Sequence, residues 1–191
     1  MDALTHCIEA YANRFAHPLV DAWALEGIRL IARYLPRAVA DGQDLEARSA
    51  MMRASLYGGM CLGPVNTAAV HALAYPLGGE FHIAHGVANG LLLPHVLRFN
   101  TSASPERYAD IARALGAGAA DGHEAQAAAG IERVFELCRQ CGIPDQMRRY
   151  GVDQADIPRM AKAAMSVTRL LERNLREVTE ADAVRIYEAA W

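Results

Sequence analysis

Apolar residues recur at intervals of three and four along most of the chain, which is the spacing that places them on one side of an α-helix. The segments between turn residues are rich in Ala, Leu, Arg, Glu and Met, which favour helices, and strand-like alternation is scarce. The pattern therefore predicts an all-α protein. The expected helices are 2–15, 18–41, 45–62, 66–77, 85–98, 105–115, 124–141, 157–175 and 180–190.

Turn and cap residues mark the ends of these segments. Pro18 suits a first helical turn, Asn66 is a candidate N-cap after a Gly-Pro pair, and Thr179 is a candidate N-cap before Glu180. The small residues of "GAGAADG", 116–122, predict a flexible loop. Because neither side of this loop has much core by itself, we expect one domain, residues 1–191, built as a multi-helix bundle.

Charge and composition narrow the classes of partner. The 191 residues include 19 Lys and Arg against 22 Asp and Glu, for a net charge of -3, and both signs are interspersed along the chain. This distribution argues against nucleic acid or a membrane surface as a partner. No apolar run reaches the roughly 18 to 20 residues that span a bilayer, and the start lacks the order of a secretory signal, so we expect a cytoplasmic protein.

Histidines are concentrated in one segment. Three of the seven, His71, His82 and His85, lie between residues 70 and 86. His71 falls in an expected helix and His85 begins the next one, with Gly78-Gly79 between them to let the chain turn back. The segment therefore predicts a helix, a glycine turn and a second helix, each offering one imidazole.

Asp2 and His6 are spaced four apart, so on a helix both side chains lie on one face and can share one cation. Together with His71 and His85 they form a nitrogen and oxygen donor set that suits Fe(II) or Zn(II), acting as a Lewis acid. The spacing alone leaves a second interpretation open, since a buried histidine is more often a hydrogen-bonded core residue than a ligand.

Other candidate groups favour structural roles. Cys138 and Cys141 have the spacing of a redox or half-zinc motif, but no second pair exists, and we interpret them as residues of a partly buried helix. His95 lies in an apolar segment and is interpreted as a core or interface histidine.

Three stretches resemble, in this order, the helical C-terminal domain of the iron-containing alcohol dehydrogenases, the group III family with a dehydroquinate synthase-like fold. They are "MDALTHCIEAY" (1–11), "VHALAYPLGGEFHIAHGVANGLLLPHVLRFN" (70–100) and "NLREVTEADAVRIYEAAW" (174–191). The resemblance implies that the metal, Fe2+ or else Zn2+, is held by Asp2, His6, His71 and His85.

The same resemblance implies an activity. It indicates an NAD- or NADP-dependent oxidoreductase that interconverts a small alcohol with an aldehyde or ketone, with the metal polarising the substrate oxygen, and a homo-oligomer, simplest as a dimer. Family members also carry an N-terminal α/β domain that binds the dinucleotide. These 191 residues contain no G-x-G-x-x-G or comparable unit, so we expect that domain to be absent from this chain and the chain by itself to be inactive.

An alternative interpretation is that the chain is a truncated helical module that folds and binds metal without catalytic turnover. A metal hydrolase is a further alternative, for which no well-placed general base is found.

One position departs from the family pattern. The family usually has a further histidine four residues after its third ligand, near the nicotinamide and the substrate, and this chain has Tyr75 there. Tyrosine exchanges protons less readily at neutral pH than imidazole. We therefore name Tyr75 and His82 as candidate catalytic residues, with His82 the natural substitute if its helix extends back from His85.

Overall fold

The computed structural model describes residues 1–191 and contains ten α-helices and three short 3-10 helices, with no β-strand. This confirms the all-α prediction. The α-helices are α1 (Asp2–Tyr11), α2 (Pro18–Ala40), α3 (Leu45–Leu62), α4 (Ala69–Phe81), α5 (His85–Asn100), α6 (Pro105–Ala114), α7 (His123–Gln140), α8 (Ile157–Met165), α9 (Thr168–Leu171) and α10 (Glu180–Ala190).

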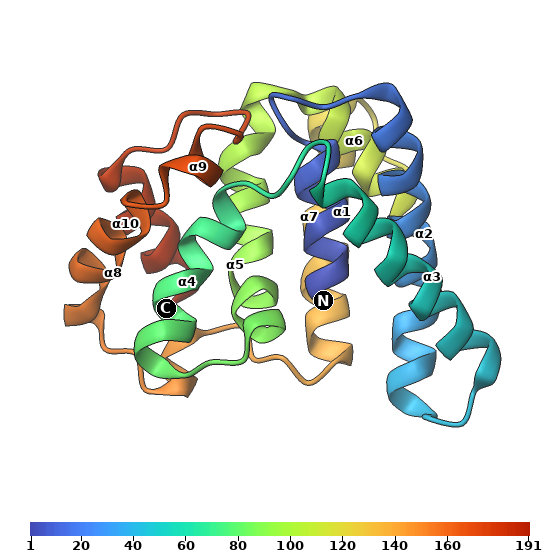
Figure 1. Ribbon diagram of the computed structural model, residues 1–191, viewed down its shortest axis with the longest axis horizontal. Helices are drawn as coiled ribbons and strands as arrows, with labels where there is room; N and C mark the ends of the chain where they lie inside the picture. Colours follow the sequence, from blue (N-terminus) through green and yellow to red (C-terminus); the bar gives the residue numbers. More distant parts are fainter.

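Helix α1 lies in the middle of the molecule. It packs against α2 and α3 on one side and α5 on the other, while α4 packs on α5 and α8, and the N-terminus lies near the centre of the view (Figure 1). Its side chains Leu4, Cys7 and Ile8 are fully buried or nearly so, in a core that extends through all the long helices. Asp2 and His6 on this helix therefore lie between the neighbouring helices, and both are partly exposed.

Several predicted boundaries are confirmed. Helices α3 and α10 begin and end where the sequence pattern places them. Thr179 caps α10 as predicted: its hydroxyl accepts a hydrogen bond from the backbone N–H of Asp182, whose carboxylate in turn accepts from the N–H of Thr179. This reciprocal arrangement satisfies donors that a helix N-terminus otherwise leaves without partners.

Two predicted helices are too long. Helix α1 ends at Tyr11 rather than at residue 15. Just past this end, the side-chain amide of Asn13 donates to the carbonyl of Glu9, and the backbone of Asn13 pairs with that of Asn174. The segment 157–175 is divided into α8 and α9, because the Ser166 hydroxyl donates to the carbonyl of Ala163 and ends the first helix. Such local side-chain bonds compete with helical backbone bonds.

The predicted turn at Gly78-Gly79 is wrong. Both glycines lie inside α4, and the chain reverses at His82, which has a φ of 54° in the left-handed region. Asn66 is not an N-cap either: it also has a positive φ, of 77°, and Ala68 precedes the first residue of α4. Asparagine tolerates this conformation better than most residues, so it suits the turn that leads into α4.

None of the helices is both long enough and apolar enough to cross a lipid bilayer.

Candidate metal centre

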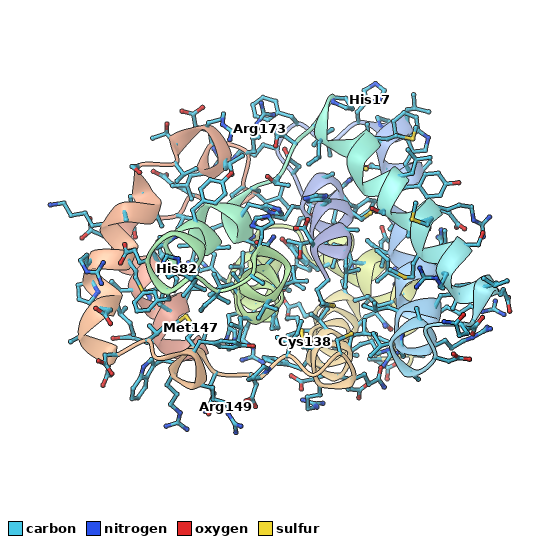
Figure 2. All side chains as sticks on the ribbon, turned by 60° about the horizontal axis from the view of Figure 1, so that its bottom comes forward. His17, His82, Cys138, Met147, Arg149 and Arg173 are labelled. Carbon is cyan, nitrogen blue, oxygen red and sulfur yellow. The ribbon has the colours of Figure 1, made fainter.

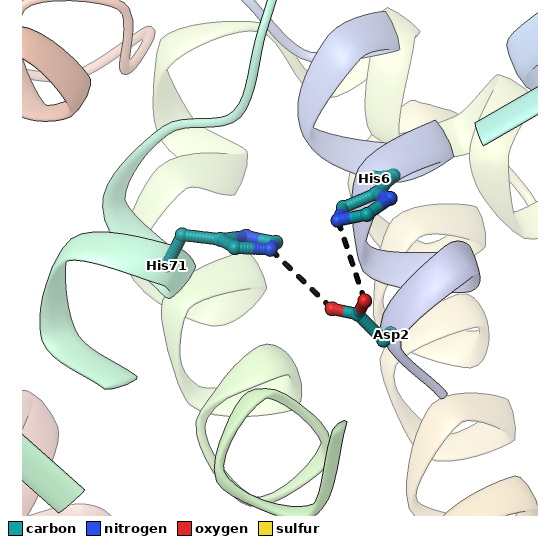
Figure 3. Close-up of side chains that lie close together, drawn as sticks. All are labelled: Asp2, His6 and His71. Atoms are coloured by element: carbon teal, nitrogen blue, oxygen red, sulfur yellow. Dashed lines mark ion pairs between the residues drawn. The ribbon is translucent and has the colours of Figure 1, made fainter. Parts of the chain in front are cut away.

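Helix α1 contributes two of the predicted ligands. Asp2 and His6 lie one turn apart, and Nε2 of His6 is 3.5 Å from Oδ2 of Asp2. Figure 3 shows both side chains pointing from α1 toward α4. As the spacing of four residues predicts, the two side chains lie on the same face of the helix.

The other two predicted ligands come from different helices and meet the same carboxylate. Nε2 of His71, in α4, and Nε2 of His85, the first residue of α5, each lie 3.4 Å from Oδ1 of Asp2. The ring centroids of His6 and His71 are 5.0 Å apart, and those of His71 and His85 are 5.2 Å apart. Three imidazoles and one carboxylate thus converge from three helices.

The four side chains differ in exposure and closeness. Ligand atoms of Asp2, His6 and His71 all lie within 4.8 Å of one another, whereas His85 is half exposed and approaches the group through Asp2. His71 is buried. The cluster is therefore shielded from solvent at His71 and reaches the surface at His85.

Electrostatics favour a negative Asp2 and a neutral His6. Burial raises the pKa of the Asp2 carboxyl, but hydrogen bonds from His71 and Asn89 and the charges of His6 and His85 outweigh it and hold that pKa well below its ordinary value. Burial lowers the pKa of His6, and the charge of Asp2 offsets part of the effect. These are the protonation states in which both groups can bind a cation.

His71 behaves differently. Burial lowers its pKa, but hydrogen bonds to Asp2 and Glu9 outweigh the burial and raise the pKa to about 9. A cation at its Nε2 must therefore replace a proton, so binding competes with protonation of this imidazole.

Two further residues, which the sequence pattern did not single out, belong to the cluster. Glu9 is buried, and its Oε2 lies 2.6 Å from Nδ1 of His71. Asn89 is fully buried, and its amide nitrogen donates to Oδ1 of Asp2 at 2.7 Å. Helical spacing could have identified both residues. Glu9 follows His6 by three residues and Asn89 follows His85 by four, so each shares a helix face with a candidate ligand.

Tyr75 and His82 lie outside this cluster. His82 is exposed at the end of α4 (Figure 2), and α5 begins only at His85, so the premise that one helix carries both imidazoles is wrong. The left-handed backbone at His82 breaks the helical register between them. Tyr75 lies one turn after His71 on α4, as predicted, and its side chain is exposed at 43%. Neither forms a hydrogen bond or ion pair with the four predicted ligands.

The structural interpretations of His95 and Cys138 are confirmed, whereas Cys141 lies just past the end of α7 and not within the helix. His95 is buried in α5, and its ring packs nearly perpendicular to that of Phe135 at a centroid distance of 5.4 Å. Cys138 is buried in α7, its thiol donates to the carbonyl of Gly90, and burial raises its pKa to about 12. A thiol with so high a pKa stays protonated at neutral pH and is a poor nucleophile or metal ligand.

A cavity of about 740 Å³ opens beside the cluster. Its lining includes Asp2 and His6 of α1 and Met51, Met52 and Ser55 of α3. The lining therefore combines polar groups of the cluster with apolar methionine side chains.

Known proteins match the whole of this chain. The sequence model of the Fe-containing alcohol dehydrogenase family, C-terminal, matches residues 1–191. The 1,3-propanediol dehydrogenase of Citrobacter freundii is 44% identical over 193 residues, which cover 100% of this chain and 49% of that protein.

Solved structures agree. A crystal structure of 1,3-propanediol oxidoreductase superposes with a TM-score of 0.97 at 42% identity and covers 100% of this chain and 50% of that one. A sulfoacetaldehyde reductase from Bifidobacterium kashiwanohense, solved in complex with NAD+, superposes with a TM-score of 0.84 at 27% identity, covering 97% of this chain and 47% of that one. The chain spans about half the length of the relatives that it matches.

Proposed function

Because the chain belongs to the iron-containing alcohol dehydrogenase family, we propose that it is the metal-binding part of an NAD- or NADP-dependent enzyme that interconverts an alcohol with an aldehyde or ketone. The observation that carries the proposal is the convergence of three imidazole Nε2 atoms on the carboxylate of Asp2 from three separate helices. Relatives named for a diol and for an aldehyde, the latter bound to NAD+, support the substrate class and the cofactor.

The donor set fits a divalent transition metal. Imidazole nitrogen with one carboxylate oxygen suits Fe(II) or Zn(II) better than the all-oxygen preference of Ca2+ or Mg2+. Asp2, His6, His71 and His85 are the residues that would hold the metal. A metal held by them supplies Lewis acidity, which polarises the oxygen of a bound alcohol or carbonyl.

The chain's own residues orient the substrate. The oxygen of a small alcohol in the cavity faces Asp2 and His6, while its carbon chain lies against Met51 and Met52 of α3. Binding in this orientation fixes the reacting carbon relative to the cluster, and such positioning lowers the barrier to reaction.

We propose the two remaining candidates, His82 and Tyr75, as groups that exchange the substrate proton with water. Both are exposed on or at the end of α4, which also carries His71. In an enzyme assembled with its dinucleotide-binding domain, a pH profile of kcat/KM that is identical in wild type and His82→Ala would contradict this role for His82.

Metal content tests the metal centre directly. The folded chain is expected to bind about one equivalent of Fe2+ or Zn2+, and His71→Ala or His85→Ala should each remove stoichiometric metal, as measured by elemental analysis after desalting. His123→Ala, which changes an exposed histidine on α7, is the matched control and should keep the metal. Equal metal in wild type and in both ligand variants would overturn the proposal.

A further inference from the structure

Glu9 contacts both the ring of His71 and the helix that carries it. Its Oε2 lies 2.6 Å from Nδ1 of His71, and its Oε1 accepts a hydrogen bond of 2.6 Å from the backbone N–H of Val70. Glu9 is on α1 and the other two residues are in the first turn of α4. One carboxylate therefore joins the two helices at the point where the candidate ligands meet.

The contact with Nδ1 dictates which ring nitrogen faces the cluster. A carboxylate only accepts hydrogen bonds, so Nδ1 of His71 must carry the proton that it shares with Glu9. Nε2 is then the nitrogen with a free lone pair once it loses its own proton, and Nε2 is the atom that lies 3.4 Å from Asp2. This is the tautomer in which a histidine can bind a metal through Nε2.

The contact with Val70 fixes the helix itself. The first N–H groups of a helix have no partner within it, and Ala68, the residue before α4, offers no side chain to accept from them. Glu9 supplies the missing acceptor, and its negative charge suits a helix N-terminus. Both Glu9 and His71 are 4% exposed, so water competes little for either bond.

We propose that Glu9 is a positioning residue of the metal centre, which holds His71 with Nε2 toward the metal and anchors the first turn of α4 to α1. The inference rests on the proposed metal centre and adds a residue outside its four ligands. Helix α1 then provides the ligands Asp2 and His6 and, through Glu9, also orients the ligand His71 on α4.

The variant Glu9→Gln separates positioning from packing. Glutamine has the same shape, but its amide cannot accept from both partners: either its NH2 group meets Nδ1 of His71 and drives the proton to Nε2, or it meets the N–H of Val70 and leaves two donors face to face. Asp182→Asn is the matched control, since Asp182 is also a buried carboxylate at a helix N-terminus, on α10, outside the cluster.

Zinc is the probe for all variants, measured by competition with a chromogenic chelator. We expect Glu9→Gln to bind Zn2+ about 10- to 100-fold more weakly than wild type, while Asp182→Asn keeps wild-type affinity and loses only thermal stability. Equal zinc affinity in Glu9→Gln and wild type, or an equal loss in Asp182→Asn, overturns the role of Glu9. Wild-type chain that binds no zinc overturns the metal centre itself, and the inference with it.

A measurement on wild type alone covers the case in which Glu9→Gln does not fold. In the zinc-loaded chain with nitrogen-15 histidine, NMR should find the proton of His71 on Nδ1 and the metal on Nε2. A proton on Nε2 would overturn the inference.

Discussion

His95 lies in α5 with neither ring nitrogen hydrogen-bonded. Burial, together with the positive charge of Arg98, lowers its pKa to about 4, although Asp145 acts weakly in the opposite direction. The unfolded chain therefore takes up a proton on this residue at a higher pH than the folded chain does. His95 therefore leaves the free energy of unfolding unchanged well above pH 6.5 and reduces it progressively as the pH falls toward 4.

The free energy of unfolding should accordingly fall by about 2 kcal/mol between pH 7 and pH 5 because of His95 alone. In His95→Leu that part of the pH dependence should disappear, although the variant also loses the ring contact with Phe135. Urea unfolding of both proteins at the two pH values measures the difference. An identical pH dependence in wild type and variant would show that His95 titrates normally in the folded chain.

At the scale of elements, α6 and α7 approach each other closely at one glycine. A Cβ placed on Gly130 of α7 would lie 2.5 Å from Cβ and 2.8 Å from Cα of Ala112 on α6. The missing side chain is what lets these two helices touch, and no flexible side-chain end is available to move aside.

Gly130→Ala should therefore destabilise the fold by about 1 to 3 kcal/mol, since the helices must separate. Gly79→Ala is the matched control: Gly79 lies inside α4 with no atom within 4 Å of its added Cβ, and alanine there should raise stability by about 0.5 to 1 kcal/mol. Chemical denaturation compares the two variants. A neutral Gly130→Ala would mean that α6 and α7 can move apart at little cost.

At the scale of the whole molecule, the proposed ligands connect α1, α4 and α5, which contact most of the remaining helices. A metal that binds only the folded chain adds a stabilisation of RT ln(1 + [L]/Kd), about 2.7 kcal/mol at one hundred times Kd. For a domain of this size each kcal/mol corresponds to roughly 2 to 4 °C in Tm.

We therefore expect Zn2+ at saturating concentration to raise the Tm of the chain by about 5 to 10 °C and a chelator to reverse the rise. In His71→Ala the same additions should leave Tm unchanged, which excludes a general effect of the ion. A rise of equal size in this variant would place the stabilising metal elsewhere in the molecule.

The sequence alone predicted the helical class, the bounds of α3 and α10, and the shared helix face of Asp2 and His6, because helix periodicity, capping and residue spacing are local properties of neighbouring residues. Composition added His71 and His85 as further candidate donors, and the resemblance to a known family then implied that all four hold one metal. Local patterns describe one helix at a time, so they could not predict which helices contact one another.

Only the tertiary structure decided how the helices meet. The bond between Glu9 and His71 joins residues 62 positions apart, and the contact of Asn89 with Asp2 joins residues 87 positions apart. The reversal at His82 in place of the glycine pair also depends on packing, because α4 continues through both glycines to Phe81, buried along most of its length against α5 and α8. Contacts between distant segments depend on how the apolar faces of the helices pack together. The residue pattern of one helix does not specify which other helix it packs against.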